Sequence, residues 1–410
     1  MSYMKIKNCR SCKSHLIKNL YSLGNQCFTG IFPSKKNEII PKGNLEMVMC
    51  ENCKLLQLKD SFDVDLMYGE NYGYLSSLNP HMVKHLQIKA QKLKKISNLK
   101  KGDIVIDIGS NDGTSLSSYN KSNILIGVDP TIKRLNKFYR KDITKIPEFF
   151  DKSVVKKFIK NKKAKLITSI SMFYDLPDPI AFSKDIFDCL DDNGIWHLEQ
   201  SYMPSMIKNT SYDTICHEHL EYYSLRSIKH IFDNVGFKII DLEFNDINGG
   251  SFAITVAKKS AKYSEYSKII NWLLEREEIF KYNSPETHLN FFKKVKKHKK
   301  LLQDLILNLK DMKKKIIGYG ASTKGNVILQ YCNFSFNDLK FIADVNLNKK
   351  NKYTPGSSIK IMDEKEIRKY NPDYMLVLPW HFKNFILQKE KKYLNNGGKL
   401  IFPLPDIEIV

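Results

Sequence analysis

The residues best suited to acid–base chemistry lie in the run Cys216-His217-Glu218-His219. Imidazole titrates near neutral pH, so a positioned histidine is a good general base. The spacing does not fit a helical zinc motif, which needs histidines four residues apart. In an extended segment alternate side chains share a face, so we expect His217 and His219 to point one way and Glu218 the other. A lone histidine is more often a core residue, but two with a glutamate favour a functional site.

Two Cys-x-x-Cys pairs lie close to the N-terminus, Cys9 with Cys12 and Cys50 with Cys53. Paired spacing of this kind predicts one tetrahedral zinc site built from four thiolates. Four thiolates close the coordination shell and leave no position for water or substrate, so we expect the zinc to be structural. Cys27, between the pairs, is the only spare ligand. Four unrelated free thiols are the alternative, which the paired spacing disfavours.

A first nucleotide-binding loop is predicted after the apolar run 104–108. The second apolar run, 123–128, is followed directly by the acidic residue Asp129. Glycines let the backbone approach a ligand closely, and an acidic residue at the end of the next strand can bind both ribose hydroxyls. The loop lacks the Gly-x-Gly-x-x-Gly pattern of dinucleotide sites, which favours S-adenosylmethionine, a ligand without a pyrophosphate. A purely structural turn is the alternative. The predicted cofactor-binding residues are Asp107, Gly109, Ser110, Asn111, Gly113, Asp129 and Pro130.

A second glycine-rich loop, Gly318-Tyr-Gly320 with Gly325, follows the apolar residues 315–317. Asp344 comes about 20 residues later, as in dinucleotide sites. The third glycine is displaced, however, and Lys324 occupies the first turn of the predicted helix. A lysine there can bind the phosphate of a sugar nucleotide equally well, so this pattern alone leaves the ligand open.

Short apolar runs alternate with helical stretches along most of the chain, as in a doubly wound parallel sheet. We expect strands at 104–108, 123–128, 165–170 and 194–199, followed by two antiparallel strands at 237–245 and 251–258. Helices are expected over 80–99 and within 264–315, where Ser284-Pro285-Glu286 provides a helix start. The strand–helix alternation then resumes at 315–317, 341–343, 375–378 and 399–402. The fold class is therefore α/β with two Rossmann-like modules.

The chain has 410 residues, of which 42% are hydrophobic and 27% charged, so it can form several domains with real cores. Its apolar runs are far shorter than the roughly 20 residues of a membrane-spanning helix. The first residues, MSYMKIKNCRSC, lack the apolar core of a signal peptide, so we expect a cytoplasmic protein with reduced cysteines. The net charge of +22 favours anionic partners, but the lysines are scattered, as on solvated faces.

Several motifs occur here in one order: the paired Cys-x-x-Cys, Tyr72-x-Tyr74-x-Ser-Ser, Asp-Ile-Gly-Ser-Asn-Asp-Gly, His-Glu-His, Gly-Gly-Ser and Gly-Tyr-Gly-Ala-x-x-Lys-Gly. In that order the chain resembles the sugar C-methyltransferases, which act on nucleotide-linked keto-deoxysugars. The resemblance covers nearly the whole chain. It implies a zinc-binding N-terminal domain (1–65), an S-adenosylmethionine-binding methyltransferase domain (66–260) and a C-terminal Rossmann-like domain (261–410) that helps to hold the nucleotide sugar.

The resemblance also implies roles for individual residues. His219 matches the histidine that removes the acidic proton beside the sugar ketone, Glu218 matches its acidic partner, and Tyr74 matches a tyrosine near the substrate. Three positions depart from the family pattern: Cys216 replaces a tyrosine, and Asp175 and Asn248 stand where histidines are usual. The residues expected to contact the substrate are Tyr72, Asp175, Cys216, His217, Asn248, Lys324 and Asp344.

Three other functions stay open at this level. A sugar O-methyltransferase would use the same cofactor without a carbon acid, and a non-catalytic scaffold would keep only the fold. A nucleic-acid methyltransferase is disfavoured, because no basic stretch is interleaved with aromatic residues as in a strand-binding groove. We expect a monomer without membrane insertion or nucleic-acid partner. The sequence does not identify the sugar, the nucleotide or the methylated atom.

Overall fold

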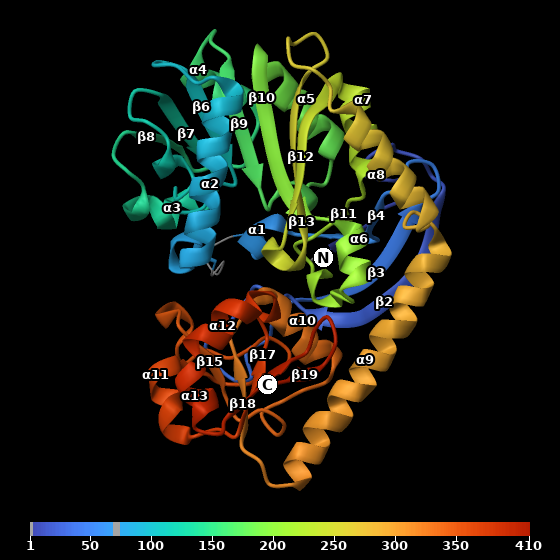
Figure 1. Cartoon of the computed structure of the whole chain (residues 1–410), viewed down its shortest axis with the longest axis vertical. Helices are drawn as coiled ribbons and strands as arrows, with labels where there is room; N and C mark the ends of the chain where they lie inside the picture. Colours follow the sequence, from blue (N-terminus) through green and yellow to red (C-terminus); the bar gives the residue numbers. More distant parts are fainter. Residues whose placement is uncertain (1–2, 69–73) are drawn as a thin grey trace.

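The computed structural model describes residues 3–68 and 74–410, excluding the side chains of Val64 and Leu66. Three α/β parts are arranged around a central junction (Figure 1). The central domain, predicted over residues 66–260 to be the methyltransferase domain, lies above the C-terminal domain, and the N-terminal sheet runs along one side of both. This arrangement confirms the predicted fold class, although where one domain ends and the next begins stays a prediction.

The N-terminal part is antiparallel and joins a strand from much later in the chain. Its strands are β1 (Tyr3–Lys5), β2 (Ile17–Cys27), β3 (Lys42–Cys50), β4 (Leu56–Leu58) and β5 (Asp60–Phe62), followed by helix α1 (Val64–Tyr68). β1 pairs with β5, while β2, β3 and β4 form a sheet completed by β11 (Glu221–Tyr222). The segment immediately after His219 is therefore part of the N-terminal sheet.

The methyltransferase domain contains a seven-stranded sheet in the order β12-β13-β10-β9-β6-β7-β8. Only the pairings of β13 with β10 and β12 are antiparallel. The strands are β6 (Ile104–Ile108), β7 (Ile124–Val128), β8 (Ile143–Ile146), β9 (Ala164–Ile170), β10 (Leu190–Ser201), β12 (Phe237–Asn245) and β13 (Ser251–Lys258). The helices are α2 (Pro80–Ser97), α3 (Ile132–Leu135), α4 (Lys152–Ile159), α5 (Pro179–Cys189), α6 (Met203–Lys208) and α7 (Leu225–Val235). Helix α8 (Ser267–Ile279) contacts α7 and leads into the C-terminal domain.

Helix α2 is held on this sheet by a buried carboxylate. Glu199, near the end of β10, accepts hydrogen bonds from His85 of α2 at 2.6 Å and from Asn245 at 2.9 Å, and pairs with Lys89 at 2.8 Å. These partners hold the pKa of Glu199 at about 2 despite its burial. The first turn of α2 consequently projects toward the C-terminal domain, where His81 contacts the ring of Phe382.

The C-terminal domain begins with a 27-residue helix, α9 (Pro285–Asp311), which starts at the predicted Ser284-Pro285 signal. The side chain of Ser284 caps it by accepting from the Thr287 amide. The sheet that follows has the order β16-β15-β14-β17-β18-β19, parallel except for β19. Its elements are β14 (Ile316–Tyr319), α10 (Thr323–Tyr331), β15 (Ile342–Asp344), β16 (Ile361–Asp363), α11 (Glu364–Ile367), β17 (Tyr374–Val377), α12 (Lys383–Lys389), α13 (Lys391–Asn395), β18 (Lys399–Phe402) and β19 (Glu408–Ile409).

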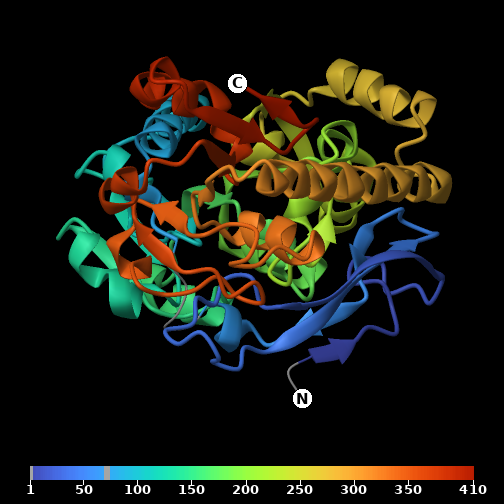
Figure 2. The same ribbon diagram turned by 90° about the horizontal axis from the view of Figure 1, so that it is seen from below.

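The N- and C-terminal parts share one hydrophobic core with the loop around Tyr212. Seen from below, α9 lies beside both α10 and the N-terminal strands, with β2 among its contacts (Figure 2). A second core joins the cysteine knuckles to one face of the methyltransferase sheet. Burial of apolar surface therefore fixes the three parts against one another. Within the part of the chain that the structure describes, no helix is both long and apolar enough to span a membrane.

Candidate functional site

The four predicted zinc ligands come together. Their sulfur atoms all lie within 4.8 Å of one another, and Cys9–Cys53 and Cys12–Cys50 are each 3.5 Å apart. Four sulfurs at about 2.3 Å from a central zinc would be separated by roughly 3.7 Å, so the cluster fits the ion. Cys27 does not belong to it; its amide donates to Gln330 of the C-terminal domain instead.

The zinc knuckles are tied to the segment that carries the histidines. Gln57 of β4 donates to the sulfur of Cys9, and Arg10, inside the first knuckle, donates to the carbonyl of Leu58. The Leu58 amide in turn donates to the carbonyl of Leu220, the residue after His219, at 2.9 Å. Two hydrogen bonds and the peptide bonds beside them therefore connect a metal ligand with the predicted base.

The predicted cofactor loop has the backbone conformation of a ligand cradle. Gly109 and Gly113 have φ of +71° and +76°, and Asn111 has +50°. A Cβ on Gly113 would lie 2.8 Å from the ring of Tyr139, so this position requires glycine for space as well as for conformation. The Ser110 hydroxyl is hydrogen-bonded to the Tyr139 hydroxyl at 2.7 Å.

Two acidic residues frame the loop, one at the end of each neighbouring strand. Asp129 accepts from the Asn111 amide at 2.8 Å and from the amide and hydroxyl of Thr131. Pro130 follows it in the turn that begins α3. Asp107 accepts from the Thr168 hydroxyl, and burial raises its pKa to about 7. The carboxyl ends of β6 and β7 are thus brought together as the sequence led us to expect.

The loop before α2 closes over this cradle. The amides of Ser76 and Ser77 donate to the side chains of Asn111 and Asp112, at 3.0 and 2.9 Å. The Asn111 side chain donates to the carbonyl of Tyr74, whose own side chain is 45% exposed. Tyr74 therefore lies against the cofactor loop. Tyr72, which we expected beside the substrate, lies outside the described residues.

The His-Glu-His segment is a turn and not an extended strand, so the expectation that its histidines share a face is wrong. The His219 amide donates to the Cys216 carbonyl, which closes the turn. His217 is fully buried between the rings of Phe28 and Phe62, and its Nε2 contacts the Gly43 carbonyl at 3.2 Å. His217 therefore belongs to the core of the N-terminal part.

His219 has a different environment, with the geometry of a base. It is the one residue of 211–220 that is not buried, and its ring packs on Tyr174 at 4.2 Å between centroids. Its Nδ1 lies 2.8 Å from the carbonyl of Thr214. A carbonyl can only accept, so Nδ1 carries the proton and Nε2 is the basic nitrogen. Burial, with the charge of Lys324 second, lowers the pKa of His219 to about 3.

Buried acidic groups lie behind His219. Glu218 accepts a hydrogen bond from Thr29 at 3.0 Å, and burial raises its pKa. Burial also raises the pKa of the Asp175 carboxyl, which is hydrogen-bonded to Tyr68 and lies in the field of Glu218. The buried Cys216 thiol is hydrogen-bonded to Glu218, and its pKa is raised well above the ordinary value. Asp175 and Cys216, two of the positions that depart from the family pattern, thus both lie close to Glu218.

The C-terminal domain places Lys324 at the same junction. Lys324, in the first turn of α10, donates to the carbonyl of Asn248 in the methyltransferase domain at 2.6 Å. Asn248 has φ of +56° and donates through its side chain to the Ser171 hydroxyl. Asp344 accepts from the amides of Ala321 and Asn346, so it shapes the glycine-rich loop after β14.

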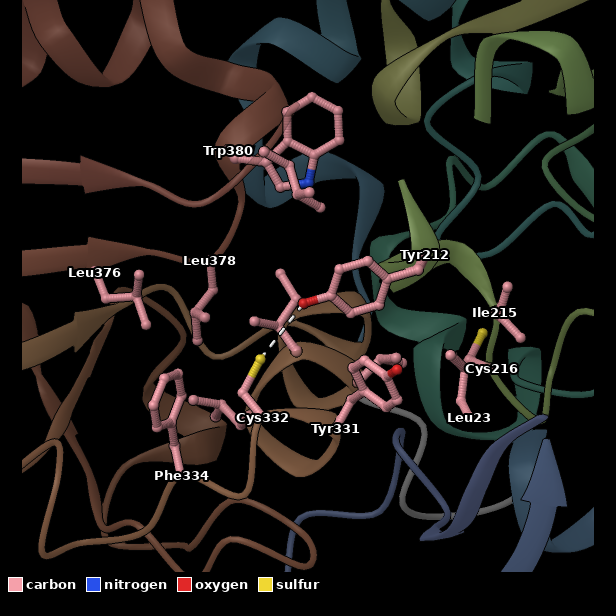
Figure 3. Close-up of a cluster of buried hydrophobic side chains, with 14 of the residues drawn as sticks. Leu23, Tyr212, Ile215, Cys216, Tyr331, Cys332, Phe334, Leu376, Leu378 and Trp380 are labelled. Atoms are coloured by element: carbon pink, nitrogen blue, oxygen red, sulfur yellow. Dashed lines mark hydrogen bonds between the residues drawn. The ribbon is translucent and has the colours of Figure 1, made fainter. Parts of the chain in front are cut away.

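Sequence reasoning missed three residues of this junction, Asp213, Trp380 and His381. The indole of Trp380 donates to Asp213 at 2.8 Å and joins the C-terminal domain to the loop before the histidines. Trp380 and Tyr212 both project into the interface, where Tyr212 is hydrogen-bonded to Cys332 (Figure 3). One signal was available: residues 380 and 381 follow the apolar run 375–378, at the carboxyl end of a parallel strand.

Three family models match consecutive parts of the chain. A zinc binding domain matches residues 9–68, a methyltransferase domain matches residues 82–242, and a C-methyltransferase C-terminal domain matches residues 246–405. The C-methyltransferase NovU of Streptomyces niveus is 27% identical over 368 residues, which cover 89% of this chain and 87% of NovU.

Solved structures are similar to a smaller share of the chain. An S-adenosylmethionine-dependent methyltransferase from Clostridium acetobutylicum is 12% identical, with a TM-score of 0.35, over 43% of this chain and 92% of its own. The plantazolicin methyltransferase BamL, solved with a triazolic desmethylPZN analog and SAH, is 13% identical, with a TM-score of 0.36, over 44% and 86%.

Proposed function

The chain belongs to the S-adenosylmethionine-dependent C-methyltransferases that carry a zinc-binding domain, and from that premise we propose that it methylates a carbon of a nucleotide-linked keto-deoxysugar. The observation that carries this proposal is His219. Its Nδ1 is fixed by the Thr214 carbonyl, and the residue is only half-buried in an otherwise buried segment. Removal of a proton from carbon requires an unprotonated nitrogen, which Nε2 provides when Nδ1 donates to the Thr214 carbonyl.

In the proposed reaction His219 Nε2 accepts the proton beside the ketone, and the resulting carbanion is the nucleophile. S-adenosylmethionine, when bound, supplies the methyl group on a sulfonium. Asp129 would bind the ribose hydroxyls, and the backbone of Gly109, Ser110, Asn111 and Gly113 would line the cofactor, with Asp107 behind it. Methyl transfer itself needs in-line placement of donor and acceptor, which closure of the Tyr74 loop over the cradle supports.

The residues around the base act by positioning it. Glu218, held by Thr29, anchors the turn to the N-terminal part, and the contact of Leu220 with β4 fixes its other end. We assign Asp175, Cys216, Asn248 and Lys324 to the sugar side of the junction. Asp344 would act through the glycine-rich loop that faces the nucleotide. His217 contributes packing only, which replaces its expected contact with the substrate.

Solvent deuterium exchange tests the proposed function. The protein would be incubated with S-adenosylhomocysteine in D₂O together with each member of a panel of dTDP- and UDP-linked keto-deoxyhexoses. We expect wild type to exchange the proton beside the ketone of at least one member, and His219→Asn to lose this exchange by at least about 100-fold. Calorimetry should show unchanged S-adenosylmethionine affinity in the variant. Methylation without exchange would instead indicate an O-methyltransferase.

The remaining expectations extend the proposal. We place the protein in the cytoplasm, where its eight cysteines stay reduced, and we expect a monomer that binds neither nucleic acid nor membrane. Product mapping by NMR with a labelled methyl donor would identify the sugar and the methylated carbon.

A further inference from the structure

Lys324 lies at the centre of the junction between the methyltransferase and C-terminal domains. It keeps part of its surface accessible, as do His219 and His381. Its ammonium makes a single hydrogen bond, 2.6 Å to the Asn248 carbonyl, among the residues that the structure describes. An ammonium has three hydrogens, so two remain available for another acceptor.

Asp213 supplies the opposite charge without forming an ion pair. One of its oxygens accepts from Trp380, while Oδ1 is buried and has no hydrogen-bond partner in the described part of the chain. Asp213 is the largest favourable charge acting on Lys324, yet no nitrogen–oxygen contact within 4.0 Å joins the two residues. A half-buried lysine and a buried carboxylate oxygen thus each keep unused hydrogen-bonding capacity near one another, and an unpartnered buried oxygen such as Asp213 Oδ1 is unusual in a protein interior.

The same ammonium acts on the proposed base. The field of Lys324 reaches His219, Cys216 and His381, the last of which has a buried Nδ1 without a partner among the described residues. The lysine comes from α10 of the C-terminal domain, and the base comes from the turn in the methyltransferase domain. The interface in Figure 3 holds the two elements together through Tyr212 and Trp380.

We propose that Lys324 is a catalytic residue: its ammonium donates a hydrogen bond to the substrate ketone and stabilises the oxyanion of the enolate. This inference rests on the proposed function. When His219 Nε2 takes the proton, the electrons of the C–H bond form the new C=C bond and the carbonyl pair moves to oxygen. The enolate then re-forms its C=O as the carbon–methyl bond forms and the sulfur–methyl bond breaks. The proton stays on His219, and Lys324 keeps its own.

The placement explains why a lysine is tolerated there. Burial lowers the pKa of Lys324, and the nearby Asp213 opposes that shift and so favours the charged form of the lysine. A developing oxyanion in a desolvated site gains most from a fixed positive charge that is already in place. The C-terminal domain then completes the catalytic site, a larger role than holding the nucleotide.

The test measures deuterium exchange and methylation by Lys324→Met with the nucleotide-linked keto-deoxyhexose of that panel that wild type exchanges. We expect exchange and kcat to fall by about 100- to 1,000-fold while KM changes by less than about 3-fold. Lys324→Arg should retain more exchange than Lys324→Met, because it keeps the charge. In Lys324→Met the fall of the exchange rate at low pH should begin at a higher pH, because His219 loses the positive charge that lowers its pKa. Asp213, Cys216 and His381 also face this lysine.

Matched controls separate the outcomes. Lys310→Met removes a lysine of α9 that pairs with Asp338, away from the junction, and should leave exchange unchanged. The S-adenosylmethionine affinity and the melting temperature of each variant show whether it is folded. Asp213→Asn should lower the exchange rate, although its side chain can still accept the hydrogen bond from Trp380. A raised KM with normal kcat in Lys324→Met would show a phosphate-binding role and overturn the proposal. Normal exchange would overturn it while the proposed function stands. If wild type exchanged no keto-sugar, both would fall.

Discussion

Two histidines only two positions apart have opposite environments in this protein. His217 is enclosed by Phe28 and Phe62, whereas His219 packs on Tyr174 at the edge of the junction. Both are neutral in the folded protein, because burial lowers their pKa values to about 4 and about 3. They differ in exposure, because His217 is fully buried whereas His219 is half-buried, and in the ring nitrogen that contacts a carbonyl, Nε2 in His217 and Nδ1 in His219.

His217 predicts a pH dependence of stability. Its pKa is about 4 in the folded protein and about 6.5 when unfolded, so between these values only the unfolded state binds the proton. Stability is therefore lost as pH falls. Between pH 7 and pH 5 we expect the free energy of unfolding to decrease more in wild type than in His217→Phe, by up to about 2 kcal/mol. Denaturant titrations at both pH values would measure this.

The exposed His15 provides the control for that comparison, since His15→Phe removes a ring that is not buried. Equal pH dependence in wild type and His217→Phe would show that His217 is not held neutral by its aromatic surroundings.

At the scale of elements, turns decide where chemistry can occur. The turn after β6 is set by glycines and Asp129, the turn before β11 by the Cys216 carbonyl, and the turn after β14 by Asp344. Each turn lies at the end of a strand or sheet, where the backbone amides are not paired with a neighbouring strand. These amides and the nearby side chains can therefore converge on a ligand.

Gly113→Ala tests the turn after β6. The new Cβ would combine a positive φ with a contact of 2.8 Å to Tyr139, so the loop must move. We expect S-adenosylmethionine to bind at least about tenfold more weakly, and the protein to lose about 1–3 kcal/mol of stability. Calorimetry and thermal unfolding measure the two effects. Gly102→Ala is matched, with φ of +86° and nothing within 4 Å, and should change stability but not affinity.

At the scale of the whole molecule, the cysteine knuckles, the turn of residues 216–219 and the C-terminal domain are connected by shared cores and hydrogen bonds. The knuckles share a core with the methyltransferase sheet, and the N-terminal sheet shares one with α9 and the C-terminal domain. Loss of the metal should therefore destabilise parts of the protein beyond the first 65 residues.

Cys50→Ser tests this connection. We expect loss of bound zinc, a lower melting temperature and faster amide hydrogen exchange in β4 and in residues 216–223, because Leu58 and Leu220 are joined directly. Cys27→Ser is the control, since Cys27 is buried in the same part but lies outside the cluster. A Cys50→Ser protein with wild-type melting temperature would contradict a structural role for the metal.

Much of the fold could be predicted because its signals are local. The apolar runs 104–108 and 251–258 became β6 and β13, and Ser284-Pro285 became the start of α9. The strands β8 and β16 were not predicted, because their sequences, ITKI and IMD, are short and interrupted by polar residues, so neither forms an apolar run. The His-Glu-His turn was mistaken for an extended stretch, because its shape depends on contacts with Thr29 and Leu58, which are distant in sequence.

The sequence by itself determined the cysteine cluster and the order of the three parts, and it predicted the cofactor loop, because each depends on local motifs and spacings of a few residues. Only the tertiary structure decided which of the two histidines is half-buried. It also brought Asp213, Lys324 and Trp380 close to one another near that histidine. Those residues come from separate segments of chain. Their meeting follows from burial of the apolar faces between domains, a condition that no local pattern records.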